Sequence, residues 1–200
     1  MLFCNTPHSQ IDNIVSCARQ IANVVLVQIK IMETKNILRI IIILSILIVN
    51  VGCDRVTKVI VRESLNYNES ISYLNNHLTL IKVENTGAFL SLGNNLPEFL
   101  RVSVLIVFPV LSLILALLFL LFKKGLSKWT LTGLAFVIGG GIGNLYDRIV
   151  FGSVTDFLHI NFVAFQTGIF NMADVSIMVG MFLILMQAFT QKTTNQLLTK

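Results

Sequence analysis

The stretch GGGIGNLYDRIVFGSVTDFLHINFVAFQTGIFNMAD, residues Gly139 to Asp174, lies between two apolar segments that read as membrane spans. It contains three of the ten acidic residues of the chain, Asp147, Asp156 and Asp174. A charged side chain at membrane depth costs on the order of a few kcal/mol unless it is paired or hydrated. Asp147 is followed directly by Arg148. Asp156 and Asp174 have no basic neighbour, so these two are the first candidates for a functional site.

The composition of the chain is that of an integral membrane protein. Of its 200 residues, 54% are hydrophobic and only 12% are charged, and the mean hydropathy is +0.79. These values lie far outside the range of soluble domains. The net charge of +5 is spread over single residues and pairs, so we assign it to membrane topology and expect no nucleic-acid partner. The three cysteines and three histidines are scattered, and we expect neither a disulfide framework nor a metal site.

Hydropathy predicts a helical membrane bundle. Its four spans lie at about 37–53, 100–122, 130–147 and 173–190. We expect one membrane domain, 32–191, followed by a cytoplasmic tail, 192–200. Residues 1–31 are expected to be an N-terminal extension that is not translated, because Met32 begins a basic and apolar sequence typical of a first membrane segment. The alternative is an interfacial helix within 21–31.

The first span has a competing interpretation. The segment resembles a secretory signal with a lipid-attachment cysteine, because two basic residues, Lys35 and Arg39, are followed by an apolar run that ends at Cys53. Asn50 is a poor fit where such a signal has leucine, and three further spans follow. We therefore favour a membrane span.

The polar residues 54–99 predict a small β-structure resting on the membrane. The segments 70–74 and 77–83 alternate like strands around the turn-forming pair Asn75-Asn76.

Two spacings predict close contacts. Asp54 and Lys58 are one helical turn apart and predict a modest ion pair at the membrane surface. Gly139 and Gly143, four residues apart in the third span, offer a smooth face for helix packing.

Basic residues near the spans predict the orientation. They gather before the first span, between the second and third, and after the fourth: Lys30, Lys35, Arg39, Lys123, Lys124, Lys128, Lys192 and Lys200. By the positive-inside rule both termini are then cytoplasmic, and residues 54–99 and 147–171 lie outside. Asp156 and Asp174 are expected at the outer membrane face.

Two carboxyl groups brought together cannot both ionise easily, so one keeps its proton while the other acts as a base. This arrangement lets an aspartic protease activate water and protonate the substrate carbonyl. A turn-like segment, 161–168, allows Asp156 and Asp174 to face each other. Asn144 and Arg148 fall on one helix face and can hydrogen-bond a peptide backbone.

Other interpretations stay open at this point. The aspartates can instead cap helices or pair with Arg148, Arg101 or Lys58, which ranks equal with proteolysis on spacing alone. A proton-coupled transporter would use Asp156 and Asp174 as a proton relay, but it predicts acidic residues in the middle of spans. A structural assembly factor would not need the pair.

Four motifs occur in order along the chain. They are Asp54-x-x-x-Lys58, VENTGAF at 83–89, GGGIGNLYDRIVFGSVTDF at 139–157 and FNMAD at 170–174. Together they resemble the lipoprotein signal peptidase family, the bacterial signal peptidase II, over about Met32 to Phe189. Thr155 stands where the family usually has a second valine, a conservative change.

The resemblance implies an aspartic endopeptidase of the bacterial inner membrane that removes the signal peptide of a prolipoprotein. Cleavage would fall just before a cysteine that carries diacylglyceryl. The implied fold is an all-α membrane bundle of four transmembrane helices with a small extracytoplasmic β-cradle. Water is the other reactant, so no cofactor is implied. The expected partners are prolipoprotein substrates and membrane lipids, and we expect a monomer.

The resemblance also implies roles for residues at the motif positions. Asp156 and Asp174 match the catalytic dyad. The positions that match substrate-binding or dyad-positioning residues are Asn85, Asn144, Arg148 and Asn171. The supporting positions are Asp54, Lys58, Gly87 and Asp147.

Overall fold

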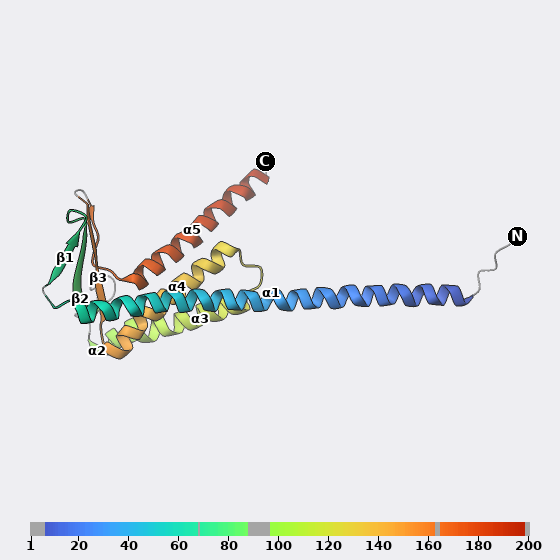
Figure 1. Ribbon diagram of the computed structural model, residues 1–200, viewed down its shortest axis with the longest axis horizontal. Helices are drawn as coiled ribbons and strands as arrows, with labels where there is room; N and C mark the ends of the chain where they lie inside the picture. The colour runs from blue at the N-terminus through green and yellow to red at the C-terminus, as the bar shows by residue number, and fades with distance from the viewer. Residues whose placement is uncertain (1–6, 68, 88–96, 163–164, 199–200) are drawn as a thin grey trace. The chain divides into compact units, whose positions relative to one another are not determined.

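The computed structural model describes residues 7–67, 69–87, 97–162 and 165–198. Its elements in chain order are α1 (Pro7–Ser64), β1 (Ser70–Tyr73), β2 (Leu78–Asn85), α2 (Glu98–Val102), η2 (Ser103–Val107), α3 (Phe108–Phe122), α4 (Lys128–Phe151), β3 (Val154–Phe162), β4 (Phe165–Gln166) and α5 (Met172–Leu198). Figure 1 shows these elements along the chain.

Within the described residues, four helical stretches are long and apolar enough to cross a membrane. They are Asn36–Ser64, Glu98–Phe122, Lys128–Phe151 and Met172–Gln191. The predicted bundle of four transmembrane helices is therefore confirmed. The chain divides into two compact units, 1–42 and 43–200, and the second unit contains the end of α1 and all later elements.

Helix α1 continues well beyond the expected end of the first span, as far as Ser64. Its buried positions Asp54, Lys58 and Val61 follow at spacings of four and three residues, which is the period of one helix face. Asp54 and Lys58 are charged and lower the local hydropathy. The predicted span therefore ends before the helix does.

The second span is assembled from α2, the π-helical turn η2 and α3. Pro109, the second residue of α3, has no N–H to donate to the preceding turn. The π-helical turn, Ser103–Val107, lies just before this proline. The irregularity falls where the proline predicts a distortion.

The sheet is antiparallel, in the order β1-β2-β3-β4. Its first hairpin turns at Leu74, Asn75 and Asn76, which all have positive φ. The predicted strands on either side of Asn75-Asn76 are thus confirmed. Strand β3 comes from the segment after α4, for which the sequence analysis predicted no strand, and it pairs with β2.

Glycines let the helices of the bundle approach closely. A Cβ atom on Gly133 of α4 would lie 2.7 Å from the carbonyl oxygen of Gly180 on α5. Cβ atoms on Gly139 and Gly143 would lie 2.9 Å from the Asn50 Cβ and 2.6 Å from a carboxylate oxygen of Asp54, both on α1. The predicted smooth face of the third span therefore packs against α1.

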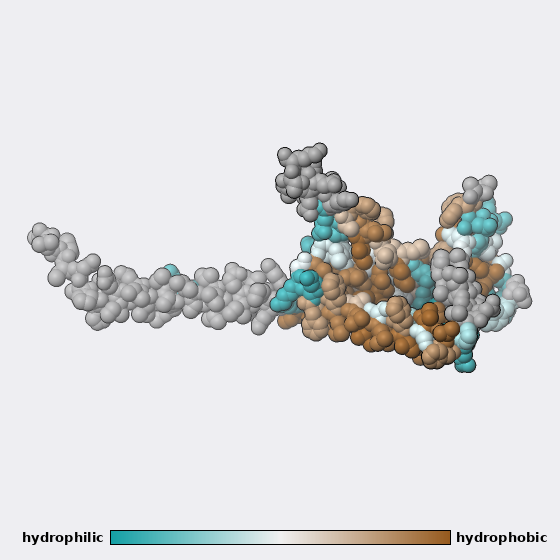
Figure 2. Space-filling model, turned by 180° about the vertical axis from the view of Figure 1, so that it is seen from behind, coloured by the Kyte–Doolittle hydropathy of each residue, from teal (hydrophilic) through white to brown (hydrophobic). Residues whose placement is uncertain are grey.

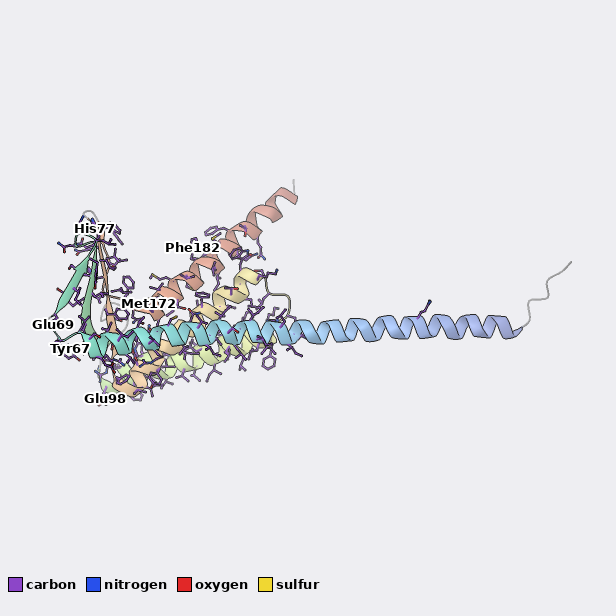
Figure 3. The ribbon with its side chains drawn as sticks, viewed as in Figure 1. Tyr67, Glu69, His77, Glu98, Met172 and Phe182 are labelled. Atoms are coloured by element: carbon purple, nitrogen blue, oxygen red, sulfur yellow. The ribbon has the colours of Figure 1, made fainter. Side chains whose placement is uncertain are left out.

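The helices of the second unit carry a broad apolar surface. Figure 1 shows the sheet beside the end of α1 and the start of α5. On the face in Figure 2, apolar residues cover the middle of the helices, and polar residues lie at the sheet and at the opposite ends of the helices. Figure 3 labels Tyr67, Glu69 and His77 around the sheet, and Phe182 along α5, where its side chain is 61% exposed. An apolar helical surface of this kind suits a lipid environment.

The close approach of α4 and α5 is expected to make Gly133 intolerant of a side chain. Gly133→Ala should lower the free energy of unfolding by about 1–3 kcal/mol, because the backbone oxygen of Gly180 cannot move aside alone. Gly52→Ala is the matched control, since a Cβ there meets no atom within 4 Å. It should be neutral or stabilising by up to about 1 kcal/mol. Unfolding in detergent micelles measures both, and equal stabilities of the two variants would contradict the packing.

Candidate functional site

Lys58 lies at the centre of a buried ion network. Its Nζ is 2.8 Å from Asp54 Oδ2 and 3.0 Å from Asp147 Oδ2, and none of the three side chains is exposed. Asp54 also accepts a hydrogen bond of 3.0 Å from the backbone N–H of Ala173, at the start of α5. The expected Asp54–Lys58 pair therefore exists. It is fully buried and not at a surface, because Gly143 leaves room for the Asp54 carboxylate.

Two arginines of α1 also pair with Asp147. Arg55 Nη1 forms an ion pair with Asp147 Oδ1, and Arg62 Nη2 lies 3.2 Å from the same oxygen. Arg148, the chain neighbour of Asp147, instead donates from Nη2 to the carbonyl oxygen of Gly87 at 3.1 Å. Neither Arg55 nor Arg62 was among the residues predicted from the sequence, although their spacing from Lys58 on one helix was a usable signal.

Asp156 and Asp174 reach one cavity from different elements. Asp156 lies on β3 and Asp174 in the first turn of α5. Both line a cavity of about 50 Å³, together with Asn85, Asn144 and Arg148. A cavity of this size can hold a water molecule. The structure thus gathers both predicted aspartates and three of the predicted polar residues around one space.

The carboxyl group of Asp156 is held by two amides. Asn171 Nδ2 donates to its Oδ1 at 2.6 Å, and Asn85 Nδ2 donates to its Oδ2 at 3.0 Å. Gly87 N–H donates to Asn85 Oδ1 at 3.0 Å, which directs the NH₂ group of Asn85 toward Asp156. Both oxygens of Asp156 therefore have fixed partners.

Burial raises the pKa of Asp156 to about 6, and this residue is only 5% exposed. The negative charge of Asp174 acts in the same direction. The hydrogen bonds from Asn85 and Asn171 and the charge of Lys58 oppose the rise in pKa. Asp156 can therefore gain or lose a proton near neutral pH, as a general acid or base must.

Asp174 is held by a reciprocal cap at the start of α5. The Asn171 N–H donates to Asp174 Oδ2 at 3.1 Å, and the Asp174 N–H donates to Asn171 Oδ1 at 3.0 Å. One oxygen of Asp174, Oδ2, therefore caps the start of the helix, which was the alternative role considered for the aspartates. Its other oxygen, Oδ1, accepts a hydrogen bond of 2.8 Å from Asn144 Nδ2.

Asn144 connects the ion network to the aspartates. Its Oδ1 accepts from Lys58 Nζ at 2.9 Å and from Asn171 Nδ2 at 3.1 Å. An ammonium group can only donate, so the amide oxygen of Asn144 must face Lys58 and its NH₂ group must face Asp174. Lys58 therefore orients the amide of Asn144, and Lys58 is itself held by Asp54 and Asp147.

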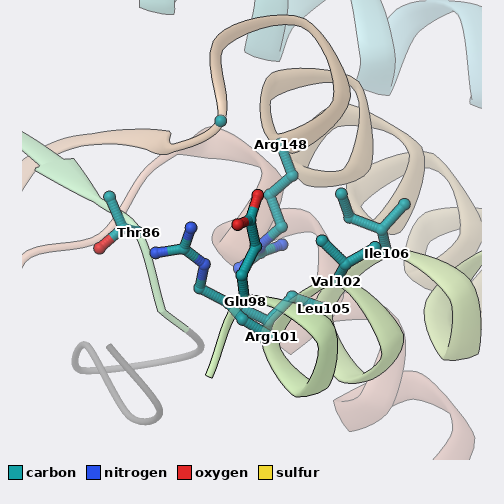
Figure 4. Close-up of a pocket in the computed structure, with 8 residues that line it drawn as sticks. Thr86, Glu98, Arg101, Val102, Leu105, Ile106 and Arg148 are labelled. Atoms are coloured by element: carbon teal, nitrogen blue, oxygen red, sulfur yellow. The ribbon is translucent and has the colours of Figure 1, made fainter. Parts of the chain in front are cut away.

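A second cavity of about 210 Å³ lies beside the first and shares Arg148 with it. Its lining residues are Thr86, Glu98, Arg101, Val102, Leu105, Ile106, Arg148 and Gly152. Figure 4 shows the carboxylate of Glu98 near the guanidinium groups of Arg101 and Arg148, with the apolar side chains of α2 and η2 on one side. From the sequence, Arg101 was predicted only as a possible ion-pair partner of the aspartates.

No three His, Cys, Asp or Glu side chains in the described part of the chain are grouped so as to hold a metal ion.

Comparisons with known proteins show which family this chain is similar to. Residues 44–190 match the family model described as signal peptidase (SPase) II. The lipoprotein signal peptidase of Maridesulfovibrio salexigens is 31% identical over 145 residues, which cover 72% of this chain and 93% of that protein. That of Enterococcus faecalis is 37% identical over 134 residues, covering 67% and 79%. That of Aquifex aeolicus is 34% identical over 110 residues, covering 55% of this chain and 65% of that protein.

Solved structures share the fold. A bacterial membrane enzyme solved by the in meso method at 2.3 Å resolution is 25% identical, with a TM-score of 0.67 over 76% of this chain and 90% of that chain. A second, solved by the same method at 1.9 Å resolution, is 23% identical with a TM-score of 0.65 and supports the fold alone.

Lys58 is expected to be essential for stability. Lys58→Met leaves the carboxylates of Asp54 and Asp147 buried without their shared partner, which should lower the free energy of unfolding by about 3–5 kcal/mol. Lys124→Met, at an exposed position, is the matched control. Denaturation in detergent compares them, and a Lys58→Met protein as stable as the control would show that the network is dispensable.

The raised pKa of Asp156 predicts a pH-dependent stability. The folded state binds this proton more tightly than the unfolded state, so stability falls as pH rises from about 4 to above 6. Asp156→Asn cannot titrate there. Its stability relative to wild type should therefore increase by up to about 3 kcal/mol between pH 4 and pH 8. Thermal unfolding at both pH values measures this, with the exposed Glu63→Gln as control. A difference that is constant with pH would contradict the raised pKa.

Proposed function

Because this chain belongs to the signal peptidase II family, we propose that it is an aspartic endopeptidase of the bacterial membrane. It removes the signal peptide from prolipoproteins by cleaving before the cysteine that carries diacylglyceryl. The observation that carries the proposal is the cavity shared by Asp156 and Asp174, which are the catalytic dyad.

The two carboxyl groups divide the chemistry between them. The raised pKa of Asp156 supports its role as the proton holder. Asp174 lies in the first turn of α5, where the helix dipole favours a carboxylate, which supports its role as the base. Asp174 takes a proton from water as the oxygen attacks the scissile carbonyl carbon, and Asp156 gives its proton to the carbonyl oxygen. The tetrahedral intermediate then breaks its C–N bond. The leaving nitrogen receives the proton from Asp174, and a hydroxyl group of the intermediate returns a proton to Asp156 as the new carboxyl group forms.

Arg148 is the residue that binds the substrate backbone. Its Nε is buried and has no hydrogen-bond partner among the described residues, so it can donate to a peptide carbonyl. Asn85, Asn144 and Asn171 position the carboxyl groups through the hydrogen bonds given above and complete the substrate site.

The positive-inside rule supports an orientation for the site. Lys123, Lys124 and Lys128 lie in or next to the connection between α3 and α4, which is therefore cytoplasmic. With four spans, both termini are cytoplasmic and the sheet and the dyad face the outer leaflet, where the lipidated cysteine of a substrate would lie. Membrane lipids surround the exposed apolar helices. One chain supplies both aspartates, which supports a monomer as the working unit.

The charges inside the spans count against a proton-coupled transporter. Asp54 and Asp147 are each paired with Lys58, and Asp147 also with Arg55 and Arg62. These carboxylates are neutralised by neighbours and are not free to relay protons.

A cleavage assay with purified protein in detergent tests the proposal. The substrate is a diacylglyceryl-modified prolipoprotein, and the same protein without the lipid is its control. Wild type should shorten only the lipidated form. The cleavage rate should fall about a hundredfold to ten-thousandfold in each of the variants Asp156→Asn and Asp174→Asn, because each substitution removes a group that moves a proton.

Glu69→Gln is the matched control for these variants, since Glu69 is exposed and contacts Asn66 outside the cavity. It should cleave like wild type. Full activity of either aspartate variant would overturn the dyad, and a folded wild type that cleaves neither substrate would overturn the proposed function.

A further inference from the structure

The strand pair that carries Asp156 has two chemically different faces. Residues alternate between the faces of a strand, so Asn85 on β2 and Asp156 on β3 share the face toward the cavity. Glu84 on β2 lies directly opposite Thr155 on β3, and both point to the other face. That second face carries polar side chains that have no part in the proposed chemistry.

These polar side chains form one hydrogen-bonded group, the Glu84 cluster, made up of Arg62, Glu84, Ser153 and Thr155. Ser153 Oγ donates to Glu84 Oε2 at 2.6 Å, and Thr155 Oγ1 donates to Glu84 Oε1 at 2.8 Å. Arg62 Nε donates to Thr155 Oγ1 at 2.7 Å. Thr155 is completely buried, and the Glu84 side chain is 24% exposed. One carboxylate thus joins β2 to two residues of the β3 segment.

Arg62 attaches the Glu84 cluster to the helices. Besides Thr155, its guanidinium group pairs with Asp147 at 3.2 Å and lies 3.9 Å from the ring centroid of Phe151, at the end of α4. Asp147 in turn holds Lys58. The cluster is therefore continuous with the ion network behind the aspartates.

The register of β2 against β3 near the cavity decides whether Asn85 reaches Asp156. The pairing shifts between Leu80 and Val83, and only the pairs from Val83 to Asn85 follow before the strands separate. Because side chains alternate between the two faces of a strand, a slip of one residue in this ladder would turn Asn85 away from Asp156.

We propose that Glu84 is a positioning residue for the reaction, which holds β2 in register on β3 through Ser153 and Thr155 so that Asn85 reaches Asp156. The inference rests on the proposed function for its catalytic consequence. The geometry that it describes is separate from substrate binding, because the Glu84 cluster lies on the face of the strands turned away from the cavity.

The direction of the effect can be derived from the groups that face Asp156. The charged ones are Asp174 on α5, Lys58 on α1 and Arg148 on α4. The hydrogen bond from Asn85 lowers the pKa of Asp156, so weakening it should raise that pKa above about 6. Loss of the negative charge of Glu84 alone would act in the opposite direction.

The experiment uses the full chain with ¹³C-labelled aspartate, and the Asp156 signal is assigned by its loss in Asp156→Asn. Glu84→Ala should raise the titration midpoint of Asp156 and lower kcat about tenfold with little change in KM, because the catalytic group is displaced and substrate contacts are kept. Thr155→Val removes one hydroxyl group without changing the charge. It should also raise the titration midpoint of Asp156 and lower kcat, each by a smaller amount than Glu84→Ala does. Glu84→Gln keeps an acceptor for the hydroxyls and should recover most of the loss.

Glu63→Gln is the charge control, since it removes an exposed carboxylate next to Arg62. It should leave both measurements unchanged. The proposal is overturned if Glu84→Ala and Thr155→Val keep the wild-type midpoint and kcat, even where their melting temperatures fall. If Glu84→Ala does not fold, Thr155→Val decides alone. If wild type does not cleave, the proposed function fails, and the titration still decides the positioning role.

Discussion

The site depends on one ammonium group shared by two carboxylates inside a helix bundle. Lys58 pairs with Asp54 of its own helix and with Asp147 of α4, and it also donates to Asn144. Asp54 in turn holds the start of α5 through the N–H of Ala173. Charge pairing at this depth is obligatory, since an unpaired carboxylate is costly there. The same contacts fix three helices relative to one another, so the requirement for neutrality also determines where Asp174 lies.

Much of this arrangement could be predicted from the residues. The four spans follow from apolar length, and the first hairpin follows from strand-like alternation around Asn75-Asn76. The costly placement of Asp156 and Asp174 singled out the pair before any contact was known. The motif resemblance then supplied Asn85 and Asn171, whose amides prove to hold Asp156. Nothing in their spacing alone would have selected them.

The remaining features depend on contacts between residues far apart in the chain. β3 pairs with β2 across about seventy residues, and such pairing leaves little local signal beyond the alternation in VTDFLHINF, which we did not read as a strand. Hydropathy also hides charged residues that are buried as pairs, which is why the end of α1 and the role of Arg62 were missed. Thr155 was predicted to be a conservative change, because the sequence does not show that its hydroxyl group donates a hydrogen bond to Glu84.

The reciprocal cap of Asn171 and Asp174 has a consequence for biogenesis. These two residues lie at the start of the last helix, so a ribosome finishes them only after α1 and α4 have been made. Until then the nascent chain contains Asp156 without its partner carboxyl group. The Asp54–Lys58 pair within α1 is already electrically neutral at that stage, so the first helix can enter the bilayer before Asp147 arrives. If Asp156 and Asp174 are the dyad, as proposed, both carboxyl groups are present only after the start of α5 has been made.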